Sequence, residues 1–354
     1  MLHADRFMHN LWNKLYADFK LCCCFSGNTL GYTALNTEGI KAFRCVSSEP
    51  SWDDPSLAYL YKWQYQLHSL FKRYRFRNDL YDGIQLEEIT NQKFNNLQIK
   101  LATIKPEITR RETTRRVVSG VRRLLRSWLG PVPSYNDLAM MCQFSTKATV
   151  GNPKSDAYLE KKFTVGTGSQ RHINKFLDML SDDVHLTRAR KSITFKPIGE
   201  LKKVNVPKSY KIKRGITPNT TIGAYLTKGV GCYLEHVCDN LGISVQTTQH
   251  RHRRLVKFAS IDRKLVTADL SSASDCFTVA LLNALLPREW YRFLLDGRIA
   301  YLSGEHTSSK LESVMTMGIG YTFPLETILF YAILRSIEEQ LGMSGSEISV
   351  YGDE

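Results

Sequence analysis

The sequence predicts an α+β fold, and its C-terminal quarter carries the pattern that predicts it. Residues 264–271, KLVTADLS, form an apolar, β-branched run that ends in an acid, which is typical of a strand. A helix is predicted over 272–287, where Pro287 ends it, and a second helix over 323–341. EISVYGD, 347–353, predicts a final strand. Strand, helix, loop, helix and strand in this order indicate an α/β or α+β sheet domain.

The segments upstream are predicted to be mostly helical. Residues 1–100 are rich in aromatic residues and indicate mixed helix and loop, with apolar residues at helical spacing over 56–76. Over 105–129 the spacing predicts a helix with one apolar stripe, made of Val118, Val121, Leu125 and Trp128. The GPVP stretch at 130–133 breaks that pattern and predicts a joint between subdomains.

Composition and charge point to a folded protein with a polyanionic partner. The 354 residues are 43% hydrophobic and 23% charged, as in soluble globular proteins. The net charge of +14 favours nucleic acid as the partner, and a basic surface with no specific partner is the alternative. The sequence has no uninterrupted apolar stretch of membrane-spanning length and no apolar signal segment. Its cysteines show no disulfide framework, which favours a reducing compartment.

Paired arginines recur along the predicted helix over 105–129, as Arg110/Arg111, Arg115/Arg116 and Arg122/Arg123. Such a run is either a solvated helix face or a wall that faces phosphates. Only Glu107 and Glu112 offset the arginines there, which favours phosphate, but the pattern leaves both interpretations open.

Two acid-tipped segments suggest metal-assisted chemistry. If the two predicted strands lie side by side, Asp269 meets Asp353 and Glu354 at one sheet edge. Carboxylates this close repel one another unless a cation lies between them. Carboxylate oxygens suit Mg²⁺, and two such ions can clamp the attacking and leaving oxygens of a phosphoryl transfer.

Three motifs carry a family resemblance. TADLSSASD (267–275), MTMGIGYTFPLET (315–327) and VYGDE (350–354) resemble, in order and spacing, motifs A, B and C of the RNA-directed RNA polymerases of single-stranded RNA bacteriophages, the levivirus replicases. Residues 206–243 are similar to motif F of that family and the helix after it. The close resemblance covers about 204–354, and the part before it matches loosely, mainly through FSTKATVG at 144–151.

The resemblance implies a right-hand polymerase fold that comprises fingers and a partial palm, with the thumb missing. It implies an N-terminal helical and fingers region over 1–130, fingers over 131–260, and a partial palm over 261–354. The basic motif through which nucleotides enter would span 204–230. Motif C lies within a hairpin in such polymerases, so we expect this sequence to be a fragment that is inactive by itself.

The resemblance also assigns roles to individual residues. Asp269, Asp353 and Glu354 would be catalytic and would hold two Mg²⁺ ions, with Mn²⁺ as an alternative. Asp275 would approach the ribose 2′-OH, and Gly318 and Gly320 would let a loop bend beside the nucleotide. The incoming triphosphate would be neutralised by Lys208, Lys211 and Arg214.

Two positions depart from the family pattern, and a third has an ordinary interpretation. Glu354 stands where the family has a second Asp, which makes Asp353 the more secure metal ligand. Ile319 stands where motif B has Asn, so ribose selection would depend more on Asp275. Glu326 is expected to be a first-turn helix acid that the helix dipole stabilises.

The implied function is template-directed synthesis of RNA from ribonucleoside triphosphates on a viral RNA template, in the cytoplasm of an infected bacterium. The partners would be template and product RNA, with host elongation factors Tu and Ts as partners that the family suggests, and no membrane. The alternatives are a non-catalytic RNA-binding protein and a polymerase of the reverse transcriptase type.

Overall fold

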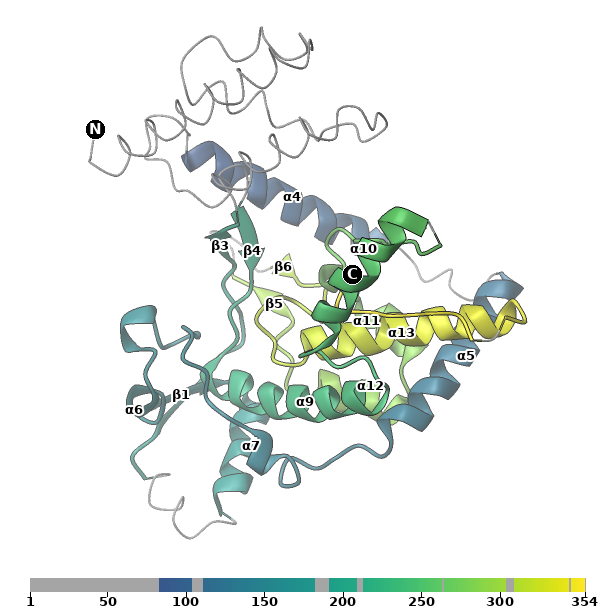
Figure 1. Ribbon diagram of the computed structural model, residues 1–354. Helices are drawn as coiled ribbons and strands as arrows, with labels where there is room; N and C mark the ends of the chain where they lie inside the picture. Colours follow the sequence, from purple (N-terminus) through teal and green to yellow (C-terminus); the bar gives the residue numbers. More distant parts are fainter. Residues whose placement is uncertain are drawn as a thin grey trace, which may run out of the picture. The chain divides into compact units, whose positions relative to one another are not determined.

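The computed structural model describes residues 83–103, 111–181, 191–208, 213–262, 264–303, 309–343 and 345–353 (Figure 1). The helix predicted over 56–76 lies outside these residues. The chain divides into two compact units: Met1–Phe94 with Asn205–Gly215, and Asn95–Val204 with Ile216–Glu354. The division of the sequence into fingers and palm regions stays a prediction.

Helices predominate in the described part of the chain. The α-helices are α4 (Gly83–Thr103), α5 (Glu112–Leu129), α6 (Leu159–Lys162), α7 (Gln170–Ser181), α9 (Thr221–Asn240), α10 (Thr248–Asp262), α11 (Val279–Leu285), α12 (Arg288–Leu295) and α13 (Thr322–Gln340). Short 3-10 turns are η3 (Ala139–Met141), η4 (Lys154–Asp156) and η5 (Ser274–Cys276). Together with the strands they make a mixed fold that is consistent with α+β.

The strands form three small sheets. β1 (Val165–Gly168) pairs in parallel with β2 (Thr194–Pro197), in the register Val165 to Thr194. β3 (Val204–Pro207) pairs with β4 (Lys213–Ile216), and β5 (Tyr301–Leu302) pairs antiparallel with β6 (Ser309–Lys310). No larger sheet is present among the described residues.

The main core of the larger unit lies where α5 and α9 pack on α13. Val121 and Leu125 of the predicted stripe are fully buried, and Val118 and Trp128 pack against the same cluster, so the predicted helix face is confirmed. Gly120 lets α5 approach α13 closely, because a Cβ there would overlap the Ser336 hydroxyl. That hydroxyl donates to the Val117 carbonyl at 2.8 Å. α5 ends at Leu129, as the GPVP breaker predicts.

Several predicted boundaries around the acidic segments are wrong. Residues 264–270 and 347–351 have no regular strand conformation, and the helix predicted over 272–287 begins only at Val279, after the turn η5. A strand needs a partner for its backbone groups. Among the described residues, a single backbone hydrogen bond, from Leu270 to Asp353, joins the two acid-tipped segments. The helix predicted over 323–341 is confirmed as α13.

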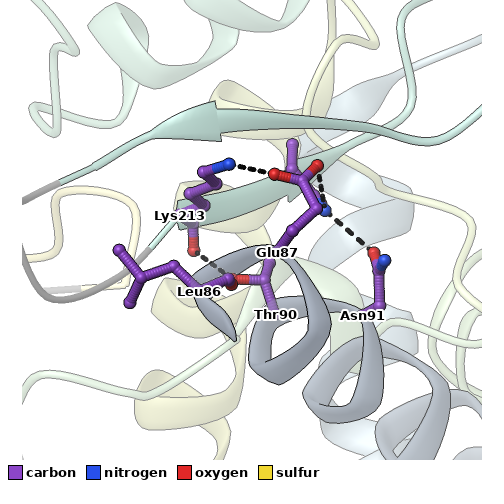
Figure 2. A network of polar contacts seen from close by, with 6 residues as sticks. Leu86, Glu87, Thr90, Asn91 and Lys213 are labelled. Atoms are coloured by element: carbon purple, nitrogen blue, oxygen red, sulfur yellow. Dashed lines mark hydrogen bonds and ion pairs between the residues drawn. The ribbon is translucent and has the colours of Figure 1, made fainter. Parts of the chain in front are cut away.

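The smaller unit contains a polar network that Figure 2 shows. Glu87 of α4 accepts a hydrogen bond from Asn205 at 3.0 Å and forms an ion pair with Lys213 of β4. The Asn205 amide also donates to Asn91 at 2.8 Å. These contacts tie the first half of α4 to the β3–β4 pair. In the described parts of both units, no helix combines the length and apolar character that a membrane crossing requires.

Candidate active site

The segment that carries Asp269 meets the segment that carries Asp353. The Leu270 amide donates to the Asp353 carbonyl at 3.2 Å, which places the two predicted metal ligands one residue from a shared hydrogen bond. Both aspartates line one cavity of about 820 Å³, whose other walls come from α10, from α13 and from residues 347–350. The predicted meeting of the two acid-tipped segments is therefore confirmed, although neither is a regular strand.

The turn before Asp353 is held by α13. Gly352 has a φ of 62°, a left-handed conformation that glycine adopts without strain. Its amide donates to the Thr327 hydroxyl at 2.9 Å, and a Cβ at Gly352 would overlap the Phe323 ring. Phe323 also packs edge-on against Tyr351, with 4.8 Å between ring centroids. The main chain beside Asp353 is thus fixed by both a hydrogen bond and ring packing.

Gly318 and Gly320 form the close-packed loop that precedes α13. Gly318 has a φ of 123°, and a Cβ there would lie 2.6 Å from the Thr217 carbonyl oxygen. A Cβ on Gly320 would lie 2.6 Å from the Lys228 amide nitrogen in α9. Both glycines are therefore required by close backbone approach, which agrees with the bend predicted for this loop. Their contact with a nucleotide stays a prediction.

Glu326 differs from its expected role. It lies in the second turn of α13 and not the first, and its side chain is only 4% exposed. Its Oε1 atom has no hydrogen-bond partner among the described residues. Burial, together with the negative charges of Asp353 and Asp275, raises the pKa of this carboxyl to about 7. Glu326 is thus a buried acid beside the candidate site, and the helix-dipole interpretation is wrong.

Asp275 lies in the turn η5, half-buried, between the Asp269 segment and α11. Its carbonyl accepts a hydrogen bond from the Ser313 hydroxyl, which ties this turn to the strand-like segment before motif B. The Val314 amide donates to the Phe277 carbonyl at 2.8 Å, which is a second hydrogen bond between the same two segments. The negative charges of Asp275 and Asp353 both raise the pKa of Glu326, so the three carboxyl groups belong to one acidic region.

The predicted triphosphate-binding residues belong to the β3–β4 pair. Lys208 follows β3 and is exposed, Arg214 lies within β4 and is exposed, and Lys211 lies outside the described residues. Lys213, between them, is held by Glu87 (Figure 2). Lys208 and Arg214 are thus the exposed cations at the described ends of this hairpin.

The donor set suits a hard divalent cation. Asp269 and Asp353 offer carboxylate oxygens at one cavity, which is the chemistry that Mg²⁺ takes in proteins. Within the described ranges, no three His, Cys, Asp or Glu side chains gather closely enough to hold a metal. Glu354, the remaining predicted ligand, lies outside those ranges.

Three arginines of the α5 pairs, Arg116, Arg122 and Arg123, are engaged within the protein. Arg116 forms an ion pair with Glu112, and Arg123 forms one with Glu339 at 2.5 Å. Arg122 donates to the carbonyls of Asn283 and Ala284 at 2.9 and 2.7 Å, where α11 ends. These contacts favour the interpretation of this helix as a solvated and structural face.

The comparisons with known proteins agree with the motifs. A family model described as RNA replicase, beta-chain, matches residues 85–354. This chain belongs to the RNA replicase beta-chain family. Similar curated relatives include the RNA-directed RNA polymerase subunit beta of Escherichia virus Qbeta, 27% identical over 338 residues, which are 92% of this chain and 54% of the relative. The RNA-directed RNA polymerase beta chain of Escherichia phage MS2 is 32% identical over 237 residues, 65% of this chain and 43% of the relative.

This replicase family member spans about half the length of those curated relatives. The match to the family model starts at residue 85 and so includes all but the first two described residues of the two units. The levivirus resemblance of motifs A, B and C is therefore confirmed at the level of the family.

Two residues of the site were not predicted from the sequence. Thr327 is the last residue of motif B and accepts a hydrogen bond from the Gly352 amide. Glu326 has a buried carboxylate oxygen without a hydrogen-bond partner among the described residues, beside the acidic region. Their sequence signal is weak, because a Glu-Thr pair in a helix is ordinary. They could have been noticed because they are polar residues within a stretch of α13 that is otherwise apolar, from Leu325 to Leu329.

Proposed function

We propose that this chain takes part in template-directed synthesis of RNA from ribonucleoside triphosphates by two-metal-ion nucleotidyl transfer. The observation that supports it is the hydrogen bond from Leu270 to the Asp353 carbonyl, which brings Asp269 and Asp353 to the same cavity. A structural role for these acids would not require two aspartates from distant segments to border one open space.

Asp269 and Asp353 would hold Mg²⁺ ions, and Glu354 would contribute a third carboxylate. When bound, such ions supply positive charge to the attacking and leaving oxygens of phosphoryl transfer, and Mn²⁺ could replace Mg²⁺. The protein's own part is to fix the two carboxylates. The Thr327 hydroxyl and the Phe323 ring do so for the turn that carries Asp353.

Other residues would bind and select the nucleotide. Asp275 would accept a hydrogen bond from the ribose 2′-OH and so favour ribonucleotides over deoxyribonucleotides. The main chain at Gly318 and Gly320 would form a tight bend beside the nucleotide, where side chains are excluded. Lys208, Lys211 and Arg214 would neutralise the triphosphate.

The fingers and partial-palm arrangement, the viral RNA template and the infected bacterial cytoplasm are part of the same proposal. The family resemblance suggests host elongation factors Tu and Ts as protein partners. Co-purification of both factors with the chain from a bacterial host would support that partnership, and their absence from the purified chain would count against it.

Mg²⁺-dependent incorporation of labelled ribonucleotides on an RNA template tests the proposed function. The assay uses the longest chain that the reading frame encodes. We expect Asp269→Asn to abolish incorporation while RNA affinity stays within about twofold, since one carboxylate of the metal site is lost. Asp178→Asn, an exposed residue of α7, is the matched control and should keep full activity. Normal synthesis by Asp269→Asn would refute the metal assignment.

A further inference from the structure

α10 presents a basic face that the proposed catalytic roles do not use. α10 has one acid, Asp262 at its C-terminal end, and six basic residues: His250, Arg251, His252, Arg253, Arg254 and Lys257. Four of them fall at positions i, i+3, i+4 and i+7 of the helix, which places them on one side. These four, His250, Arg253, Arg254 and Lys257, are all exposed and are called the outer face of α10 below.

The opposite side of α10 is fixed against the candidate active site. His252 and the Ser349 hydroxyl are hydrogen-bonded at 2.8 Å, and Arg251 forms an ion pair with Glu347 at 2.5 Å. Leu255 and Ala259 line the cavity that Asp269 and Asp353 also line. The helix is therefore held to the segment that leads to Asp353, and helical spacing places its outer face on the side away from that segment.

Two arginines of the outer face have no acidic partner within the described part of the chain. Arg253 and Arg254 make no ion pair there, whereas Arg251 is paired with Glu347. Two arginines of α5 give the contrast, because Arg116 and Arg123 each have an acidic partner. Exposed cations in a row repel one another, so an arrangement without acids is favourable mainly when an external anion lies against it.

We propose that the outer face of α10 binds the phosphodiester backbone of RNA next to the active site. The inference rests on the proposed function, which supplies RNA as the polyanion. Arginine and lysine on one helix face can each contact a phosphate oxygen, and binding releases the cations condensed on the RNA. Such contacts position the nucleic acid without selecting sequence. The role of α10 is thus to hold RNA at the cavity that contains Asp269 and Asp353.

Binding of the purified chain to a fluorescent single-stranded RNA, followed by anisotropy at several salt concentrations, tests this proposal. Arg253→Gln with Arg254→Gln removes two charges and keeps long polar side chains. We expect the double variant to bind roughly tenfold more weakly at low salt, and the slope of log K against log salt to fall by about 1.4. Two different RNA sequences should lose affinity equally, because the contacts are to the backbone.

The matched control removes the same charge from arginines that already have partners. Arg116→Gln with Arg123→Gln should leave the affinity within about twofold and the salt slope nearly unchanged. An equal loss in both double variants would show a general charge effect and would overturn the proposal. An unchanged affinity in the α10 variant, or no RNA binding by the unsubstituted chain, would overturn it as well.

A footprint on the unsubstituted chain gives a second measurement that does not depend on the folding of a variant. RNA should protect the exposed Lys257 amine from acetylation, while equal labelling with and without RNA would contradict the proposal. The outcomes separate the two proposals. RNA binding that needs Arg253 and Arg254, without any nucleotide incorporation, would keep the role of α10 and refute the polymerase activity.

Discussion

The hydroxyl of Thr327 joins α13 to the turn that carries Asp353, because it accepts a hydrogen bond from the Gly352 amide at 2.9 Å in the protein interior. The same hydroxyl donates to the Phe323 carbonyl at 2.9 Å within α13. One side chain thus satisfies a buried backbone group of the motif C turn and is itself oriented by its own helix. The position of Asp353 depends on the packing of motif B as well as on its own segment.

Thr327→Val is expected to destabilise the chain by about 1–3 kcal/mol, since it keeps the shape of the side chain and leaves the buried Gly352 amide without an acceptor. Urea unfolding measures the change. Thr327→Ser keeps the hydroxyl and should recover most of the hydrogen-bond contribution. Equal stability of the Val variant and the unsubstituted chain would show that the Gly352 amide finds another acceptor.

Glycine substitutions test the contact between α9 and the motif B loop. Gly320→Ala and Gly231→Ala each place a methyl group against backbone, at Lys228 and at the Gly320 carbonyl respectively. Alanine gains about 1 kcal/mol of helix propensity at position 231, but overpacking against backbone costs about 1–3 kcal/mol. We therefore expect lower thermal stability for both variants.

Gly199→Ala is the control for these two substitutions, because a Cβ there meets nothing within 4 Å and the backbone is not left-handed. Its melting temperature should stay close to that of the unsubstituted chain. If Gly320→Ala melts at the same temperature as Gly199→Ala, the close approach of the motif B loop to α9 is absent in solution.

The buried carboxyl of Glu326 predicts a pH-dependent stability in buffer without divalent cations. Its pKa rises from 4.5 to about 7 on folding, so the folded chain keeps a proton that the unfolded chain loses between these values. Stability should fall as pH rises from about 4.5 to 7. Glu326→Gln removes this dependence. The free energy of unfolding of this variant, compared with that of the unsubstituted chain, should therefore be up to roughly 3 kcal/mol higher at pH 8 than at pH 4.

Urea unfolding with EDTA at pH 4 and pH 8 measures this difference. Asp178→Asn removes an exposed carboxyl of α7 that has no ion pair among the described residues, and it is the control for the change of charge. Parallel stability curves for Glu326→Gln and the unsubstituted chain would mean that Glu326 is solvated or paired in solution.

Asp275→Asn tests ribose selection. If the Asp275 carboxylate accepts the 2′-OH hydrogen bond, its loss should lower the preference for ATP over dATP by about tenfold or more, because hydrogen bonds to charged groups contribute about 1.5–3 kcal/mol. The measurement is the ratio of kcat/KM for the two nucleotides. Asp178→Asn should leave that ratio unchanged. A preserved preference in Asp275→Asn would assign ribose selection to another residue.

The sequence pattern predicted the helices whose apolar residues recur at helical spacing. The stripe of Val121 and Leu125 and the extent of α13 were predicted because helical spacing of apolar side chains is visible in a short window. The two predicted strands were wrong, since KLVTADLS and EISVYGD contain β-branched residues but belong to no β-sheet in the described part of the chain. Strand formation depends on a partner segment, which a short window does not contain.

The sequence by itself determined the order of the motifs, the family and the identity of the acids to test. Only the tertiary structure decided that Asp269 and Asp353 line the same cavity, and that Glu326 is buried beside Asp353 and Asp275. It also decided which arginines have partners, since Arg123 meets Glu339 and Arg251 meets Glu347 across long stretches of chain. The physical reason is range: residue type and spacing fix local conformation, whereas burial, pKa and charge balance depend on neighbours that folding brings from elsewhere in the chain.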